Sequence, residues 1–434
     1  MPFKYQVPDG YVTCGGKIRI YPNQMQKAYF YQAFGCCRYV WNQFKSCFDT
    51  RYQNNPKLKF PDKKLLSQML TMLKQEKPWL KDVDSLALQQ SLFNYNQAQW
   101  DFMSKKTINQ GRPHFKSRKY YKQAYTTKSV KYKIKRINEY KRNIEIIDNH
   151  HIKLPKVGII ACRNAMSYAN YTILSVTVTW RQDCDKFQVS LNGIKPASKH
   201  LKKTGKVGGI DVGLNNEWLV TSDGDRFKIP DTKISDNKLK HYTSITDKRK
   251  HFVNLKVKQF NAKNKLTQIN VYNFKNWQRS RKTKAKLNMH ITNIRLQAIY
   301  DAVNFLVRKY DIIVIEDLKV SNLMPNHYLA KAIANACWYK FRQILQYKCN
   351  WLGKKLIVVQ PQYTSRICSA CRKINPNFKH LKTNKWLSIR HWVCPYCHVS
   401  HDRDINAAIN IMNRGLALIN KNKNNIGREP TLVN

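Results

Sequence analysis

Acidic residues are scarce in this sequence. Its 434 residues include 26 Asp and Glu against 78 Lys and Arg, a formal net charge of +52. So large an excess of positive charge destabilises the isolated folded chain through self-repulsion, so we expect a polyanionic partner. The basic residues are spread along the chain and interleaved with aromatic ones, and no amphipathic anchor stands out, which favours nucleic acid over an acidic membrane surface.

Long apolar runs and a disulfide framework are lacking as well. No apolar run approaches the roughly 20 residues that span a bilayer, and the N-terminal stretch Met1–Asp9 has no apolar signal core. Most of the 12 cysteines are scattered, as is typical of reduced thiols in an intracellular protein. We therefore predict a soluble, cytoplasmic protein with no membrane partner.

Four cysteines do form a pattern, in two Cys-x-x-Cys pairs. They are Cys368 with Cys371 and Cys394 with Cys397. A two-residue gap lets one tight turn aim two sulfurs at one ion, and four thiolates are the ligand set of a zinc ribbon. The alternative is two redox pairs, but these would be expected in a thioredoxin-like context that this chain lacks. The spacing predicts structural Zn²⁺.

The first half of the chain predicts a helical block and a small antiparallel sheet or barrel. Asn23 and Gln26 fit a capping box that opens a helix, and further helices are expected over 62–73 and 85–103. Short alternating strands follow between 144 and 191, and we expect the strand at 17–21 to join them. The basic segment 116–135, with Tyr120, Tyr121 and Tyr125, is either a solvated linker or a contact for a phosphate backbone and exposed bases.

The second half predicts an alternation of strands and helices. Three antiparallel strands (206–212, 217–221 and 226–229) precede a basic helical region over 236–284 with a break near Asn273. A helix (286–310), a strand (311–318), a helix (329–351), a strand (355–359) and a last helix (404–419) follow. This is the element order of a ribonuclease H-like domain, in which the first and fourth strands lie side by side and the final helix covers their ends.

Three carboxylates converge in such a fold. Asp211 lies on the first strand, Glu316 at the end of the fourth, and Asp404 at the start of the last helix. Acids brought together are costly unless they bind cations, and Mg²⁺ prefers such oxygen ligands. Two ions about 4 Å apart can activate water and stabilise a leaving 3′-oxygen. Asp317 should face away as a cap or ion-pair partner, whereas Asp402 and Asp404 are both candidates for the helix N-cap.

Several motifs together resemble the TnpB family of transposon-encoded RNA-guided nucleases, relatives of the miniature type V CRISPR effectors. They cover much of the chain: Lys17–Pro22, Phe34–Asn42, Gly111–Ser117, Gly209–Gly213, Ile315–Leu318, Thr364–Cys371, Leu387–Cys397 and Asp402–Ala408. The last three are the most specific.

The resemblance implies an α+β, multidomain fold. A wedge-like β-barrel would be split over 1–21 and 115–197, with a helical recognition domain inserted at 22–114. A RuvC-like, RNase H-like nuclease domain would comprise 198–362 and 403–419, with a zinc ribbon inserted at 363–402 and a disordered tail at 420–434.

The resemblance also implies an activity. The chain would be a monomer on a guide RNA transcribed from the transposon end, nucleoid-associated in a prokaryotic cytoplasm. It would cut double-stranded DNA beside a short adjacent motif, at a single RuvC site. Asp211, Glu316 and Asp404 match the catalytic, Mg²⁺-binding acids, and the four cysteines match the zinc ligands. Arg390 resembles a basic position near the nuclease centre, with a phosphate-binding or lid role, and Asp402 is a possible accessory residue.

Two departures from the family pattern concern the zinc ribbon. The insert between the cysteine pairs is long and basic, and His398 stands where glycine commonly follows the last cysteine. Three rival functions are a nuclease-inactive, RNA-guided repressor, a transposase that acts on DNA ends, and a plain RNA-binding protein. The intact acids argue against the first rival.

Overall fold

The computed structural model describes residues 6–55, 61–104, 111–134, 139–197, 201–214, 217–228, 230–264, 267–318, 336–378 and 389–426. The chain divides into two compact units. The first comprises Met1–Ala197 with Lys248–Ala285, and the second comprises Ser198–Asp247 with Lys286–Asn434.

Three helices of the first unit begin at polar caps. They are α1 (Gln24–Asn54), α2 (Lys63–Glu76) and α3 (Ser85–Met103), with a short 3₁₀ turn, η1 (Pro78–Asp82), before α3. Asn23 and Gln26 form the predicted capping box, in which each side chain bonds the backbone of the other residue. Asp62 and Asp84 accept hydrogen bonds from the first turns of α2 and α3. The predicted helix starts are confirmed.

A seven-stranded antiparallel sheet completes this unit, with strand order β2-β8-β9-β1-β7-β6-β5. The strands are β1 (Tyr11–Tyr21), β2 (Lys122–Lys128), β5 (Glu145–Ile146), β6 (His151–Leu154), β7 (Gly158–Arg163), β8 (Thr172–Arg181) and β9 (Lys186–Pro196). Strands β3 (Lys131–Ile134) and β4 (Glu139–Arg142) form a separate hairpin. The N-terminal strand joins the sheet as predicted, so α1 to α3 are an insertion between β1 and β2. Among the described strand pairs, none joins β2 to β5 and closes a barrel.

The helices and the sheet of this unit share one hydrophobic core. Phe30 of α1 lies 5.8 Å from Phe187 of β9 and 6.3 Å from Tyr125 of β2, measured between ring centroids. Tyr125 is therefore buried, and the prediction that it contacts bases is wrong. Tyr120 and Tyr121 are exposed. Because residues 122–128 form β2, the alternative that segment 116–135 is a solvated linker is also wrong.

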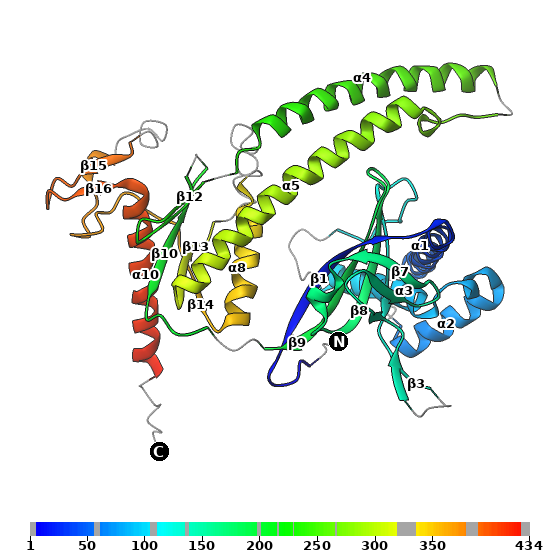
Figure 1. Cartoon of the computed structure of the whole chain (residues 1–434), viewed down its shortest axis with the longest axis horizontal. Coiled ribbons are helices and arrows are strands. Elements are labelled where there is room, and N and C mark those ends of the chain that lie inside the picture. Colours follow the sequence, from blue (N-terminus) through cyan, green and yellow to red (C-terminus); the bar gives the residue numbers. More distant parts are fainter. Residues whose placement is uncertain are drawn as a thin grey trace. The chain divides into compact units, whose positions relative to one another are not determined.

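The second unit is built on a five-stranded sheet in the order β12-β11-β10-β13-β14 (Figure 1). Its strands are β10 (Val207–Val212), β11 (Glu217–Thr221), β12 (Arg226–Lys228), β13 (Ile312–Glu316) and β14 (Lys355–Val359). The first three pair antiparallel, and β10 pairs parallel with β13, with Gly209 opposite Val314. The predicted adjacency of the first and fourth strands is confirmed.

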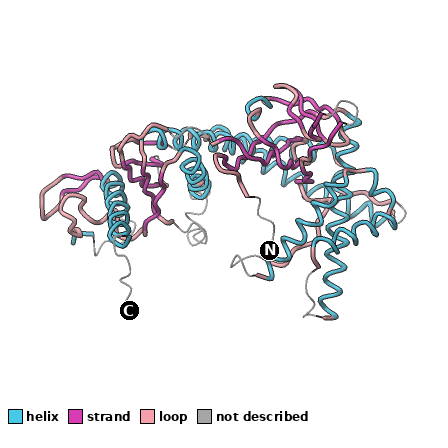
Figure 2. Tube along the Cα trace, turned by 90° about the horizontal axis from the view of Figure 1, so that it is seen from below, coloured by secondary structure: helices cyan, strands magenta, loops and turns pink. Residues whose placement is uncertain are grey.

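Helices cover both faces of this sheet. Helix α5 (Lys275–Lys309) and helix α8 (Trp338–Leu352) share a core with Ile210, Ile313 and Ile315. Helix α10 (Arg403–Ile426) runs beside the strands on the other face, where Ile411 packs against Val314 (Figures 1 and 2). Several helix boundaries differ from the prediction. Helix α2 ends at Glu76 rather than 73, and the predicted start of α8 at 329 lies outside the described residues. Helix α5 begins at Lys275 rather than 286, and α10 continues past 419 into the predicted disordered tail, of which 427–434 lie outside the described residues.

The remaining elements include the predicted basic helical region and the cysteine-rich module. Helix α4 (Lys233–Lys263) is separated from α5 by a 3₁₀ turn, η3 (Val271–Asn273), so the predicted break near Asn273 is confirmed. In the cysteine module, β15 (His391–Val393) pairs antiparallel with β16 (Ser400–Asp402). The basic insert at 379–388 lies outside the described residues. Within the described part of the chain, no helix has the length and apolar character needed to cross a membrane.

Candidate active site and metal centre

The four predicted zinc ligands lie around one point. The Sγ atoms of Cys368 and Cys397 are 3.6 Å apart, as are those of Cys371 and Cys394, and all four sulfurs lie within 4.8 Å of one another. A tetrahedral Zn²⁺ with Zn–S bonds of about 2.3 Å needs sulfurs about 3.8 Å apart. The donor set and its spacing therefore fit zinc. Among the described residues, no other group of three or more potential ligands is gathered this closely.

Both Cys-x-x-Cys turns end in a residue with left-handed backbone. The φ angle is +63° at Arg372 and +56° at His398. Their amides donate to the carbonyls of Cys368 and Cys394, both at 2.9 Å, which closes each turn around its sulfur pair. Glycine adopts this conformation most readily, which accounts for the glycine expected at position 398. The His398 departure leaves the turn intact.

A buried histidine adjoins the metal centre. Nε2 of His401 lies 3.0 Å from Sγ of Cys368, and its ring lies 4.6 Å from the Trp392 ring between centroids. Burial lowers the pKa of His401, so the neutral imidazole is favoured. A neutral ring with its proton on Nε2 can donate to a thiolate. His401 therefore joins the cysteine centre to the strand that precedes α10.

Asp211 and Glu316 lie next to each other at the ends of parallel strands. Ile210 is paired with Ile315 in the β10–β13 register, so the next residues, Asp211 and Glu316, are neighbours. Side chains alternate along a strand. Asp211 therefore shares a face with Gly209, and Glu316 shares one with Val314. That face is covered by α10.

Helix α10 approaches this face closely enough to place Asp404 beside Asp211. A Cβ at Gly209 would lie 2.0 Å from the Ala408 carbonyl oxygen and 2.7 Å from the Met412 amide nitrogen. Asp404 precedes Ala408 by four residues, about 6 Å along a helix, and Asp211 follows Gly209 by two, about 6.6 Å along a strand. These two distances are nearly equal, so Asp404 and Asp211 lie at the same end of the sheet.

The three acids interact electrostatically. Burial, followed by the nearby carboxylates of Glu316 and Asp404, raises the pKa of Asp211 to about 8. Burial also raises the pKa of Glu316, although a hydrogen bond from the Thr364 hydroxyl and the charge of Arg414 oppose the rise. A divalent cation would relieve this repulsion, and carboxylate oxygens are ligands that Mg²⁺ prefers. The residues present therefore fit Mg²⁺ in chemical type.

Asp402 and Asp404 have different partners. Asp402 Oδ1 accepts the amides of Asp404 and Ile405, both at 3.0 Å, and so occupies the N-cap of α10. Burial works to raise the pKa of Asp402, but the Ile405 amide and Arg226 outweigh it and hold that pKa below its usual range. Asp404 instead accepts Arg390 Nη1 at 2.7 Å and Arg403 Nε at 2.9 Å.

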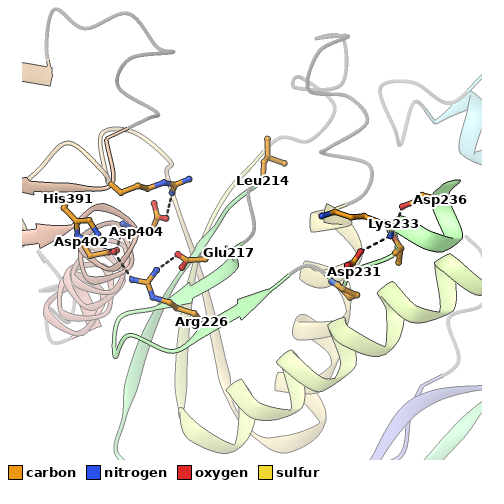
Figure 3. Close-up of a pocket in the computed structure, with 12 residues that line it drawn as sticks. Leu214, Glu217, Arg226, Asp231, Lys233, Asp236, His391, Asp402 and Asp404 are labelled. Carbon is orange, nitrogen blue, oxygen red and sulfur yellow. Dashed lines mark hydrogen bonds and ion pairs between the residues drawn. The ribbon is translucent and has the colours of Figure 1, made fainter.

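An arginine and an open pocket connect Asp402 to the sheet. Arg226 of β12 pairs with Glu217 of β11 and, at 2.8 Å, with Asp402 (Figure 3). Asp402, Asp404 and Arg390 line a pocket of about 900 Å³ that also includes Asp231 and Asp236. Asp317 faces away from the acids and pairs with Arg342, which confirms its predicted role as an ion-pair partner.

The sequence did not single out three residues that contact these acids, Thr364, Arg226 and Arg403. It also did not single out Asn406 and Asn410, which bond the backbone of the segment from Thr364 to Ser369. Thr364 Oγ1 donates to Glu316 Oε1 at 2.6 Å. A signal was available for the asparagines: Asn406 and Asn410 are four residues apart on the otherwise apolar buried face of α10, and both are buried. Arg226 gave no comparable signal, because its partners are distant in sequence.

Known proteins resemble the chain over nearly its whole length. A protein of Streptomyces pristinaespiralis, provisionally named an RNA-guided DNA endonuclease, is 30% identical over 415 residues, which cover 92% of this chain and 89% of that protein. The chain belongs to the TnpB family. InsQ of Escherichia coli K12, which carries the same provisional name, is 26% identical over 93% of the chain and 92% of its own length.

Family models match two parts of this TnpB chain. Residues 338–411 match the "Cas12f1-like, TNB domain", and residues 13–57 match a "Helix-turn-helix domain". Within 13–57 the described residues form strand β1 and the single long helix α1. Among solved structures, a Cas12f1–sgRNA–target DNA complex is similar at 14% identity, with a TM-score of 0.45, over 93% of this chain and 99% of that one.

Proposed function

We propose that this chain is an RNA-guided DNA endonuclease that cuts target DNA beside a short adjacent motif. The observation that carries the proposal is the convergence of Asp211, Glu316 and Asp404 at one end of the five-stranded sheet. Its full-length relatives bear provisional names that state the same activity. The net charge of +52 suits a protein that holds a guide RNA and a DNA duplex together.

The strand order supports a RuvC-like, RNase H-like nuclease domain made of 198–362 and 403–419. Three antiparallel strands followed by two parallel ones, with α10 across the junction of β10 and β13, are the arrangement expected of that fold. In the same proposal, 363–402 form the zinc ribbon. The sheet of the first unit, with its inserted helices, acts as the wedge and recognition region.

In this proposal each acid has a defined task. Asp211, Glu316 and Asp404 hold Mg²⁺, which would supply charge neutralisation and an activated water for phosphodiester hydrolysis. Arg390 lies at the pocket beside Asp404, where its guanidinium can bind a phosphate oxygen of the strand to be cut. Asp402 holds the first turn of α10 and thereby orients Asp404. The four cysteines hold structural Zn²⁺.

The decisive experiment is a cleavage assay on the protein purified with RNA from its own transposon end. A duplex that matches the guide should be cut on both strands in the presence of Mg²⁺. Asp404→Asn should abolish cutting and leave RNA binding unchanged. Asp402→Asn is the matched control, since asparagine is as good an N-cap as aspartate, and it should keep most of the activity.

Other outcomes would assign a different function. Target that is bound through the guide but not cut would make the chain an RNA-guided repressor. Joining of DNA ends without a guide would make it a transposase. If Asp402→Asn stops cutting and Asp404→Asn does not, the roles of the two aspartates are reversed.

A further inference from the structure

The segment that leads into the first cysteine turn touches the candidate nuclease centre. Thr364 is 6% exposed, and its hydroxyl donates to Glu316 Oε1 at 2.6 Å. A β-branched side chain has few accessible χ1 rotamers, so the backbone position of Thr364 determines where the hydroxyl points. The orientation of Glu316 therefore depends on what holds that backbone.

Two asparagines of α10 hold it. Asn410 Nδ2 donates to the carbonyls of Thr364 and Ile367, both at 2.7 Å. Asn406 Nδ2 also donates to the Ile367 carbonyl, at 2.8 Å, and its Oδ1 accepts the Ser369 amide at 2.8 Å. Ser369 lies between Cys368 and Cys371. The first cysteine turn is thus bonded to α10, whose first turn carries Asp404.

The type of donor at Glu316 matters for cation binding. Asp404 is held by two guanidinium groups, which offset its charge. The Thr364 hydroxyl is neutral, so its hydrogen bond orients the Glu316 carboxylate without cancelling its negative charge, although the Arg414 guanidinium also acts on that charge. Such partners of metal-binding carboxylates set ligand orientation and typically change metal affinity or activity about 10–100-fold.

We propose that Thr364 is the positioning residue for Glu316, held in place by Asn410 and the first cysteine turn. Through it, the zinc ribbon sets the geometry of a carboxylate in the nuclease centre. The inference rests on the proposed function of that centre. Thr364 acts through Glu316 and does not itself need to touch substrate or metal.

The test compares Thr364→Val, which keeps the shape and removes the hydroxyl, with Thr364→Ser, which keeps the hydroxyl. Mn²⁺ binding to the protein–RNA complex is measured by calorimetry, and the protein's own sites are identified as those lost in Asp404→Asn. Thr364→Val should weaken Mn²⁺ binding about 10-fold or more. It should raise the Mg²⁺ concentration for half-maximal cutting by a similar factor, and Thr364→Ser should stay close to wild type.

The controls separate positioning from general damage. Thr246→Val removes another buried threonine hydroxyl, which donates to the Tyr242 carbonyl at 2.6 Å in α4, and should leave Mn²⁺ binding unchanged. Zinc content should remain at one ion per chain in every variant. The inference is overturned if Thr364→Val binds Mn²⁺ as wild type does, or if Thr364→Ser fails equally.

The proposed function can fail separately. A wild-type complex that binds Mn²⁺ through these acids but cuts no matched duplex would refute the nuclease and leave the positioning role to be judged from Mn²⁺ binding alone. A wild-type complex that cuts, together with a Thr364→Val variant that binds and cuts equally well, would refute the positioning role alone.

Discussion

Asp211, Glu316 and Asp404 are close neighbours whose charges are balanced in different ways. Asp404 has two arginines. Glu316 has the Thr364 hydroxyl and the nearby charge of Arg414. For Asp211, burial and the neighbouring carboxylates raise the pKa to about 8 against the opposing charge of Arg403. Of the three, Asp211 therefore gains most from a bound cation. The protonation of Asp211 should make the stability of the chain depend on pH, which can be measured without a cleavage assay.

Without divalent cation, Asp211 should make the nuclease unit less stable as the pH rises. Its folded pKa of about 8 is above the value of roughly 3.9 in an unfolded chain. Between those values the folded state binds more protons than the unfolded state, so stability falls from about pH 4 to pH 8 and is level above. Asp211→Asn should remove this loss, whose upper bound at pH 8 is roughly 5 kcal/mol because each pKa unit is worth about 1.4 kcal/mol, and should raise Tm at that pH.

The measurement is a pair of melting curves at pH 5 and pH 8 without added Mg²⁺. The variant's advantage should be small at pH 5, large at pH 8, and reduced by Mg²⁺, which stabilises the ionised wild-type carboxylate. Asp317→Asn, which removes an acid that faces away from the site, provides the control. A gain that is equal at both pH values would contradict the assignment of the raised pKa to Asp211.

At the residue scale, the sequence pointed to the acids and, through the resemblance, to Arg390 beside Asp404, but not to Thr364, Arg226 or Arg403. Asp211 and Glu316 stand out because an acid within or directly after an apolar strand has no simple turn role. The partition of tasks between Asp402 and Asp404 could not be deduced, since both fit a helix N-terminus. It depends on which carboxylate accepts the Ile405 amide, and the structure shows that this is Asp402.

The contact between β10 and α10 is the element-scale feature on which the site depends. Gly209→Ala would place a methyl group 2.0 Å from the Ala408 carbonyl oxygen, and backbone cannot move aside as a flexible side chain can. We expect a loss of at least about 3 kcal/mol in unfolding free energy, at or above the usual range for overpacking. Activity should fall as well, because α10 carries Asp404. Denaturant unfolding and cleavage assays measure both effects.

Gly35→Ala is the matched substitution. Gly35 lies within α1, where an added Cβ would meet only the Arg38 guanidinium at 3.9 Å. Alanine is favoured over glycine inside a helix by up to about 1 kcal/mol, so this variant should be slightly more stable than wild type. Equal stability losses in the two variants would show that Gly209 is not in tight contact with α10.

Predictions at the element scale succeeded where periodicity and caps agreed. Helix α3 and strand β14 occur over the predicted residues, and the Asn23 cap opens α1. They failed where packing overrides local pattern. In the sequence, Val157, Ile159 and Ala161 alternate as a buried face would. In β7, however, Ile160 and Cys162 are buried and Ile159 is 57% exposed, so the buried face is shifted by one residue.

At the scale of the whole molecule, each unit has its own hydrophobic core, and the cysteine centre belongs to the second. Zinc can be removed with a chelator of low Mg²⁺ affinity, such as 1,10-phenanthroline. Its removal should lower the midpoint temperature at which the second unit unfolds in calorimetry and leave that of the first unit unchanged. Cutting should be lost, because the first turn of α10 is bonded to the cysteine module. Added Zn²⁺ should restore both. Equal shifts of both transitions would mean that the units do not unfold independently.

The distance from Gly209 to Asp211 along β10 equals that from Ala408 to Asp404 along α10 to within about 1 Å. This match restricts where residues can be inserted into or deleted from the chain. One residue added between Asp404 and Ala408 would turn the carboxylate by about 100° around the helix. One residue added between Gly209 and Asp211 would send that acid to the opposite face of the sheet. Natural length variation should therefore avoid both intervals, so the spacing within them identifies an active centre where overall sequence similarity has faded.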